Sequence, residues 1–270
     1  MSIELVQSKK QVDDIVDYIG VDYKKTPYLY VNVIKYGVGS ENCQCWIDNV
    51  DGAIQGVYFK YFDCLHFFSR ESQKYSVDKF MDIQKGIVKK VIMTTSDFGE
   101  RIEELFDNEY FYVEKNNVID MDGIKPVVND FRSCLATSKD VPEIVDLLLS
   151  DKEYTEMYSR EILLKQMQER FSDDFSRYFV VKMDDKIVAS CSTYGEVPGF
   201  ALIGSVIVHP EYRRRGLASD VENFACYLLE TEGISRVGFV NYNNEASLAL
   251  HEKLGAKKTS TLYKFVKKDI

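Results

Sequence analysis

Hydrophobic positions recur along the first half of the chain at spacings that predict helices and strands in alternation. Val12, Ile15, Val16 and Ile19 fall on one face of a helix over residues 9–19. The same periodicity predicts helices over 77–89 and 102–106. Apolar runs bounded by turn residues predict strands over residues 28–36, 43–47, 53–59, 64–68, 91–94, 110–113 and 118–121.

The second half of the chain repeats this mixture. The pattern predicts helices over 140–149, 159–169, 217–229 and 245–254, and strands over 178–183, 186–194, 200–208, 237–240 and 261–266. Turn residues cluster at 121–130, so we expect one domain over residues 1–126 and another over 127–270. The expected fold class is α/β, an α+β arrangement of a mixed sheet with helices on its faces.

Charge and hydropathy narrow the possible partners. The sequence has 34 Lys and Arg against 43 Asp and Glu, a formal net charge of −9. A chain of this charge repels polyanions, so we expect no nucleic-acid partner. The first residues lack the apolar stretch of a signal peptide, and the longest uncharged run, 197–210, is shorter than the roughly 18 residues of a membrane span. We therefore expect a cytoplasmic protein without a membrane partner.

One group of residues is a candidate metal site, namely Cys43, Cys45, Cys64 and His66. Their C-x-C spacing differs from the C-x₂₋₄-C pairs of zinc sites. Cysteine is often simply a small buried residue, and without an export signal it stays reduced. We therefore expect packing cysteines and no metal.

The stretch VIVHPEYRRRGLAS at 206–219 joins an apolar strand to a helix through a basic turn. A helix N-terminus leaves backbone N–H groups unpaired and carries a partial positive charge. Gly216 and Ala218 would let a phosphate approach those groups closely, and Arg213, Arg214 and Arg215 add charge beside them. The stretch predicts a pyrophosphate site, and the alternative is a solvated basic turn.

A segment further along the chain favours the pyrophosphate reading. Together with the turn, it resembles the GNAT superfamily of acyl-CoA-dependent N-acetyltransferases over about residues 131–270. The family's cofactor loop, [QR]-x-x-G-x-[GA], is matched by Arg213, Gly216 and Ala218. Its later motif, N-x-x-[AS]-x-x-L-Y-x-K-x-G-F, is matched by Asn244, Ser247, Leu250, Lys253 and Gly255. The chain departs from this motif in having His251 in place of the tyrosine and Ala256 in place of the last aromatic.

The resemblance implies a cofactor site for acetyl-CoA. The backbone of Val206 and Val208 would bind pantetheine and polarise the thioester, and Asn244 would contact the cofactor near its sulfur. The implied cofactor-binding residues are Val206, Ile207, Val208, Arg213, Arg214, Arg215, Gly216, Leu217, Ala218, Ser219 and Asn244.

Two residues are candidates for proton transfer. His251 stands where the family's tyrosine protonates the departing thiolate, and an imidazolium is a stronger acid than a phenol. The alternative for His251 is a helix residue with a packing role. Glu196, in the turn before the cofactor strand, is the candidate base, although charged turn residues are commonly just exposed. Tyr194 and Tyr242 are near in sequence and would instead hold an ordered water.

The function expected from this resemblance is acetyl-CoA-dependent N-acetylation of a small amine by direct transfer. One alternative is a non-catalytic acyl-CoA-binding or regulatory module, and another is an N-acyltransferase for a longer acyl chain. The order of elements in residues 1–126 echoes the second half but lacks its R-x-x-G-x-A loop. We interpret this half as a degenerate second GNAT-like domain, so that the chain is a tandem. An unrelated α/β domain is the alternative.

Overall fold

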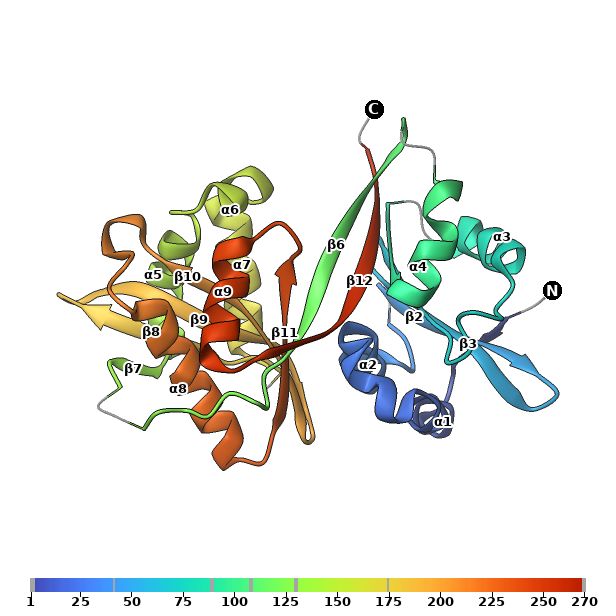
Figure 1. The fold of residues 1–270 in the computed structure, drawn as a ribbon, viewed down its shortest axis with the longest axis horizontal. Coiled ribbons are helices and arrows are strands. Elements are labelled where there is room, and N and C mark those ends of the chain that lie inside the picture. The colour runs from blue at the N-terminus through green and yellow to red at the C-terminus, as the bar shows by residue number, and fades with distance from the viewer. Residues whose placement is uncertain are drawn as a thin grey trace. The chain divides into compact units, whose positions relative to one another are not determined.

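The computed structural model describes residues 3–40, 42–87, 90–106, 109–128, 131–173 and 175–268. The chain divides into two compact units, whose elements are labelled in Figure 1. Unit 1 comprises Met1–Ile119, Phe239–Glu245 and Lys258–Ile270, and unit 2 comprises Asp120–Gly238 and Ala246–Lys257. These bounds differ from the predicted halves 1–126 and 127–270, because a strand near the C-terminus pairs with a strand of unit 1.

Unit 1 is built on a mixed sheet. Its strands are β1 (Glu4–Leu5), β2 (Cys43–Val50), β3 (Ala53–Tyr61), β4 (Cys64–Phe68), β5 (Val91–Thr95), β12 (Lys257–Lys267) and β6 (Phe111–Asp120), given in the order in which they neighbour one another. β2, β3 and β4 form an antiparallel meander, and β5 then pairs parallel to β4. β12 pairs antiparallel to β5, from Leu262↔Thr95 to Val266↔Val91.

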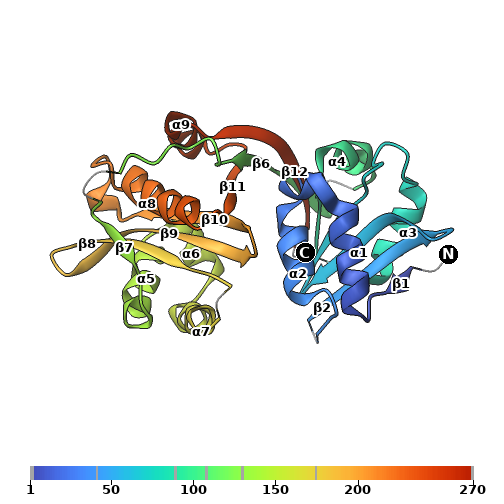
Figure 2. The same cartoon turned by 90° about the horizontal axis from the view of Figure 1, so that it is seen from below.

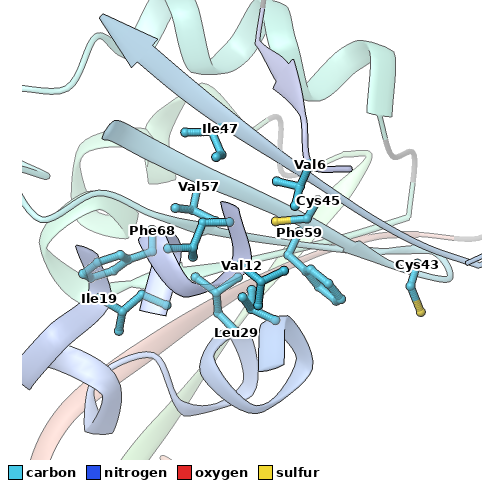
Figure 3. Close-up of a cluster of buried hydrophobic side chains, with 12 residues drawn as sticks. Val6, Val12, Ile19, Leu29, Cys43, Cys45, Ile47, Val57, Phe59 and Phe68 are labelled. Atoms are coloured by element: carbon cyan, nitrogen blue, oxygen red, sulfur yellow. The ribbon is translucent and has the colours of Figure 1, made fainter. Parts of the chain in front are cut away.

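Helices cover both faces of this sheet. They are α1 (Lys9–Ile19), η1 (Gly20–Lys24), α2 (Pro27–Tyr36), α3 (Val77–Ile87), α4 (Ser96–Ile102) and η2 (Glu103–Leu105). One core cluster joins α1 and α2 to β2 and β3, and its side chains include Val12, Leu29 and Phe59 (Figure 3). A second cluster joins α3 and α4 to the opposite face through Phe80 and Phe98. Alternation along the strands separates the two cores, because Phe59 faces the first and Tyr58 the second.

Our prediction of a strand over residues 28–36 was wrong. These residues form α2, which begins with Pro27 after the N-cap residue Thr26. Leu29, Asn32 and Val33 are buried at helical spacing on its inner face. The β-branched and aromatic residues of the run favoured a strand, but burial against β2 and β4 selects a helix.

The cysteines considered for a metal site have packing roles in the structure. Cys43 and Cys45 belong to the first core cluster of unit 1, and burial raises the pKa of the Cys45 thiol to about 12. Burial likewise raises the pKa of Cys64 to about 12. A thiol with so high a pKa stays protonated at neutral pH.

Unit 2 repeats the architecture of unit 1. Its strands are β7 (Ser133–Leu135), β8 (Tyr178–Met183), β9 (Lys186–Val197), β10 (Phe200–Val208) and β11 (Ser235–Asn241), and its helical segments are η3 (Ser138–Asp140), α5 (Val141–Leu148), α6 (Lys152–Met157), α7 (Arg160–Phe171), η4 (Pro210–Tyr212), α8 (Leu217–Thr231) and α9 (Glu245–Leu254). The last three residues of β11 and the first of α9 fall within unit 1. β8, β9 and β10 form the meander, and β11 pairs parallel to β10 as β5 does to β4. The repeat of meander, helix and parallel strand agrees with the tandem interpretation.

Helices flank the sheet of unit 2 on both faces. α5, α6 and α7 lie on one face, and α8 and α9 lie on the other (Figure 2). The core on the first face joins Ile144 of α5 and Met167 of α7 to Val180 and Ile207 of the sheet. No helix in the described ranges is long and apolar enough to span a bilayer.

Candidate active site in unit 2

The strand β10 loses one of its two neighbours partway along. β9 pairs with one edge of β10 from Phe200↔Val197 to Val208↔Ala189. β11 pairs with the other edge only from Phe200↔Ser235 to Ile203↔Gly238. Residues 204–208, which we call the splayed segment, therefore have β9 alone as a ladder partner among the residues that the structure describes. Strand N–H and C=O groups outside a ladder are available to a ligand.

A bulge distorts the splayed segment where it begins. The register between β9 and β10 shifts between Gly204↔Ser192 and Ile207↔Ser190. Ser205, within this shift, adopts φ = +51°, a conformation that side chains other than glycine rarely take. Strained backbone of this kind is concentrated at functional sites. The bulge turns the peptide groups of Ser205 and Val206 away from the regular ladder.

The chain leaves β10 through η4 and a turn that opens α8. Arg213 lies over the end of β10, where its Nε donates to the Val208 carbonyl at 3.1 Å. Arg215 lies above the Tyr212 ring, its guanidinium carbon 5.0 Å from the ring centroid. Arg214 and Gly216 both have positive φ, +64° and +76°, and Gly216 is the N-cap residue of α8. This turn aims the first N–H groups of α8, those of Leu217, Ala218 and Ser219, away from the helix.

Arg132 adds a cation to this turn that the sequence did not indicate. Its Nη2 donates to the carbonyl of Arg215 at 3.5 Å and would lie 3.8 Å from a Cβ placed on Gly216. Its Nε is 3.8 Å from Asp220, whose carboxylate also accepts from Ser133 at 2.6 Å. These contacts balance the one acidic side chain in the first turn of α8, so the start of that helix stays suited to an anion.

Comparison with known proteins shows which family has a domain of this kind. A family model described as the acetyltransferase (GNAT) family matches residues 141–256, which include β10, the turn and α8. This part of the chain is a GNAT-type acyltransferase domain. The resemblance read from Arg213, Gly216 and Ala218 is thereby confirmed.

Solved structures extend the likeness to the whole chain. A protein from Drosophila shares 13% identity and a TM-score of 0.70, with 98% of each chain covered. A GNAT-family acetyltransferase from Colwellia psychrerythraea shares 14% identity over 99% of this chain and all of its own, with a TM-score of 0.66. A tandem GNAT protein from the clavulanic acid biosynthesis pathway shares 11% identity over 98% of each chain, with a TM-score of 0.63. These likenesses confirm the tandem GNAT fold. No curated protein sequence matches the chain.

His251 of the GNAT domain is buried rather than displayed on α9. Only 5% of it is exposed, and Gly238, the last residue of β11 that pairs with β10, would place a Cβ 3.9 Å from its Nε2. Nε2 lies 2.9 Å from Oε1 of Glu222, a residue of α8 with no exposed surface. Nδ1 lies 2.6 Å from the carbonyl oxygen of Ser247, one turn earlier in α9. His251 is therefore at the base of the splay with both ring nitrogens beside acceptors.

The pairing with Glu222 sets the protonation of His251. Burial lowers the pKa of His251. The hydrogen bond and negative charge of Glu222, together with the Ser247 carbonyl, raise this pKa by more than burial lowers it, so the net shift is upward. An imidazolium can donate from both nitrogens to the two acceptors, whereas neutral imidazole can satisfy only one of them. Glu222 was missed in the sequence, although Val221, Ala225 and Cys226 around it indicate a buried helix face.

This pair predicts a pH dependence of stability. The raised pKa means that the folded state holds the proton more tightly than the unfolded state, where the pKa of His is about 6.5. The stabilisation is therefore complete below about pH 6.5 and is lost as pH rises through the folded pKa. We expect the free energy of unfolding of the natural protein, minus that of His251→Gln, to fall over this range in denaturant titrations.

The stability of His251→Gln is subtracted because a second buried histidine, His66, changes the free energy of unfolding with pH in the opposite direction. Burial lowers the pKa of His66 to about 4, so the unfolded chain gains a proton first, and stability falls as pH drops below about 6.5. His66 contributes equally to both proteins, and the difference isolates His251. A difference that does not change with pH would show that His251 is uncharged in the folded protein.

Glu196, the predicted base, is held in an ion-pair network. Both of its carboxylate oxygens accept from Arg177, at 2.8 and 2.9 Å, and Thr193 donates to it at 2.7 Å. Arg177 also donates to Glu232 at the end of α8. Glu196 is the ladder partner of Ala201. Ala201 and Val206 are five residues apart on β10, which is roughly 16 Å along the strand at about 3.3 Å per residue. The role of Glu196 as the base stays a prediction, and these contacts do not favour it.

Asn244 lies in the turn between β11 and α9. Its backbone N–H donates to the carbonyl of Asn241 at 2.9 Å, and its side chain is exposed. The residue belongs to unit 1, whereas the other predicted cofactor residues, from Val206 to Ser219, belong to unit 2. Its contact with the cofactor stays a prediction.

Proposed function

We propose that this protein transfers an acetyl group from acetyl-CoA directly to a small amine. One continuous stretch of backbone carries the proposal. The splayed segment leads through a turn with positive φ angles into the open N-terminus of α8. Unpaired strand amides suit the amide-rich pantetheine arm, and unpaired helix N–H groups suit a pyrophosphate. The GNAT family, which normally uses acyl-CoA, supports this reading.

Each part of the cofactor would meet a different group of residues. The backbone of Val206, Ile207 and Val208 would hold the pantetheine arm, with the Val206 amide directed at the thioester oxygen. Arg213, Arg214 and Arg215, with the N–H groups of Gly216, Leu217, Ala218 and Ser219, would hold the pyrophosphate. Asn244 would contact the arm near the sulfur. Arg132 joins this set because it lies beside Gly216.

His251 would supply the proton that the departing thiolate needs. Its Nε2 is in ion-pair contact with Glu222 at 2.9 Å, so the proton is proposed to leave through the other nitrogen. The Ser247 hydroxyl lies 3.4 Å from Nδ1 and is less buried than the ring. In this step Ser247 gives its hydroxyl proton to the thiolate and receives the Nδ1 proton, which leaves a neutral imidazole with its remaining proton on Nε2, beside Glu222. The ring then regains a proton from solvent between turnovers.

Release of free thiol from acetyl-CoA tests the proposed function. We expect thiol to appear only when an amine is present, with the acetylated amine formed in equal amount, across a panel of primary alkyl, aryl and amino-acid amines. The same experiment tests the rival reading, a non-catalytic acyl-CoA-binding module. That reading is favoured by the two acceptors that already occupy the His251 ring. Binding of acetyl-CoA by calorimetry without turnover of any amine would support the binding module and overturn the transferase.

A further inference from the structure

Three hydroxyl groups meet at the bulge of β10, on the sheet face opposite His251. The Ser205 Oγ lies 2.8 Å from the Tyr154 hydroxyl and 2.7 Å from the Tyr194 hydroxyl. Tyr154 comes from α6, Tyr194 from β9 and Ser205 from the splayed segment. We call these three residues the hydroxyl cluster. α6 lies on the face of α5 and α7, whereas Glu222 lies on α8 across the sheet (Figure 2).

The local backbone is shaped to bring these groups together. A Cβ on Gly204 would lie 2.2 Å from Cε2 of Tyr194, so the absence of a side chain there lets the tyrosine ring cross β10. Ser205 then takes φ = +51°, which directs its hydroxyl to the two tyrosines. A strained serine beside an essential glycine is costly for a strand. It is expected where the hydroxyl has a function.

The Ser205 hydroxyl can accept one more hydrogen bond. A serine hydroxyl has one hydrogen to donate and two lone pairs. When Tyr194 donates to Ser205 and Ser205 donates to Tyr154, one lone pair remains on Oγ. Ser205 precedes Val206, the residue proposed to face the thioester, so a donor bound to that lone pair is next to the reacting carbonyl.

We propose, resting on the proposed acetyl transfer, that the hydroxyl cluster receives the amine substrate as an ammonium ion and conducts its surplus proton to water. One ammonium N–H bond breaks as its proton passes to the Ser205 Oγ, and the original Ser205 proton passes to the Tyr154 oxygen. The Tyr154 proton then passes to water at the partly exposed side of that residue. Each hydroxyl ends as it began, the amine is neutral, and its lone pair is free to attack the thioester.

The surroundings of the hydroxyl cluster favour passing the proton along neutral hydroxyls over taking it up on an ionised tyrosine. Burial is the main cause that raises the pKa of Tyr154 and of Tyr194, so neither phenol ionises near neutral pH. Among the described residues, the charged and titratable groups that face them are Arg170 of α7 and Tyr178 of β8, and Arg170 donates to the Tyr178 hydroxyl at 3.2 Å. Neutral hydroxyls pass a proton on without holding charge, which suits a buried site. The substrate class is therefore an amine that is protonated when it arrives.

The test compares two acceptors of similar size that differ in charge. Methylamine is an ammonium ion at neutral pH, whereas methoxyamine is already neutral. Thiol release from acetyl-CoA is measured with each for the natural protein and for Tyr154→Phe and Ser205→Gly, which remove the two hydroxyls that pass the proton. Glycine tolerates the positive φ of Ser205, so that change removes the hydroxyl without adding strain. Tyr158→Phe is the matched control, because it removes a hydroxyl from the adjoining turn outside the cluster.

We expect each cluster variant to lose about tenfold or more of its turnover with methylamine at neutral pH, while turnover with methoxyamine stays within about twofold. The loss should shrink as pH rises and methylamine becomes neutral. Equal losses with both amines, or no loss, would overturn the relay while leaving acetyl transfer intact. A selective loss in Glu196→Gln with none in the cluster variants would assign deprotonation to Glu196 instead. A natural protein that binds acetyl-CoA but acetylates neither these amines nor the panel overturns the proposed function, and the relay with it.

Discussion

Gly216→Glu is expected to lower the affinity for CoA by at least about 10²-fold. The new carboxylate would stand at the open N-terminus of α8, where the pyrophosphate is proposed to bind. Juxtaposed like charges cost several kcal/mol, and each 1.4 kcal/mol is about tenfold in affinity. Gly216 also has φ = +76°, so any side chain adds strain to the turn that aims the helix N–H groups. Isothermal titration calorimetry with CoA measures the effect.

Gly233→Glu is a matched control for this variant. Gly233 follows the opposite end of the same helix and has φ = +71°, and a Cβ added to it would meet no atom of the described residues within 4 Å. The two substitutions therefore share residue type, added charge and backbone strain, and differ in which end of α8 they alter. We expect Gly233→Glu to bind CoA as the natural protein does. Equal affinity of folded Gly216→Glu and Gly233→Glu would remove α8 from the cofactor site.

His251→Gln is expected to lower turnover about 10²–10³-fold while CoA affinity stays within about threefold. Glutamine can still donate to Glu222, which matters because removing one partner of a buried ion pair destabilises a protein by about 3–5 kcal/mol. It cannot deliver a proton at neutral pH. Steady-state kinetics with the best amine of the panel, alongside thermal unfolding, separate lost chemistry from lost fold. Turnover at the natural rate would make His251 a packing residue.

Two companion variants test how the proton is held. Glu222→Gln removes the charge that raises the pKa of His251, so the alkaline limb of the pH–rate profile should move to lower pH. His251→Tyr restores the residue of the GNAT motif and should recover part of the turnover, with the alkaline limb at higher pH, because a phenol keeps its proton to about pH 10. A structural role for either residue would change the amplitude of the profile without moving its limbs.

The turn that opens α8 was predictable because its sequence signals are local. Arg213, Gly216 and Ala218 lie within six consecutive positions, and the strand before them and the helix after them are both strongly patterned. The positive φ of Gly216 is a property that the residue type itself suggests. Such features depend on neighbours in the chain rather than on the tertiary structure.

The hydroxyl cluster and the His251–Glu222 pair were not predictable, because each joins residues distant in the sequence. Tyr154 and Ser205 are separated by 51 positions and belong to different elements. The same dependence on tertiary contacts explains why residues 28–36 were expected as a strand: the residue types favour one, and only packing beneath the sheet of unit 1 makes them helical.

The pairing of β12 with β5 determines when unit 1 can finish folding. During synthesis, β5 emerges from the ribosome long before residues 258–267 exist. Until then the nascent chain carries an unpaired sheet edge, the kind of surface that recruits chaperones or pairs with other chains. A ribosome stalled near residue 126 would thus hold a unit 1 that lacks a strand. Unit 1, although its first strands are made first, is therefore completed last.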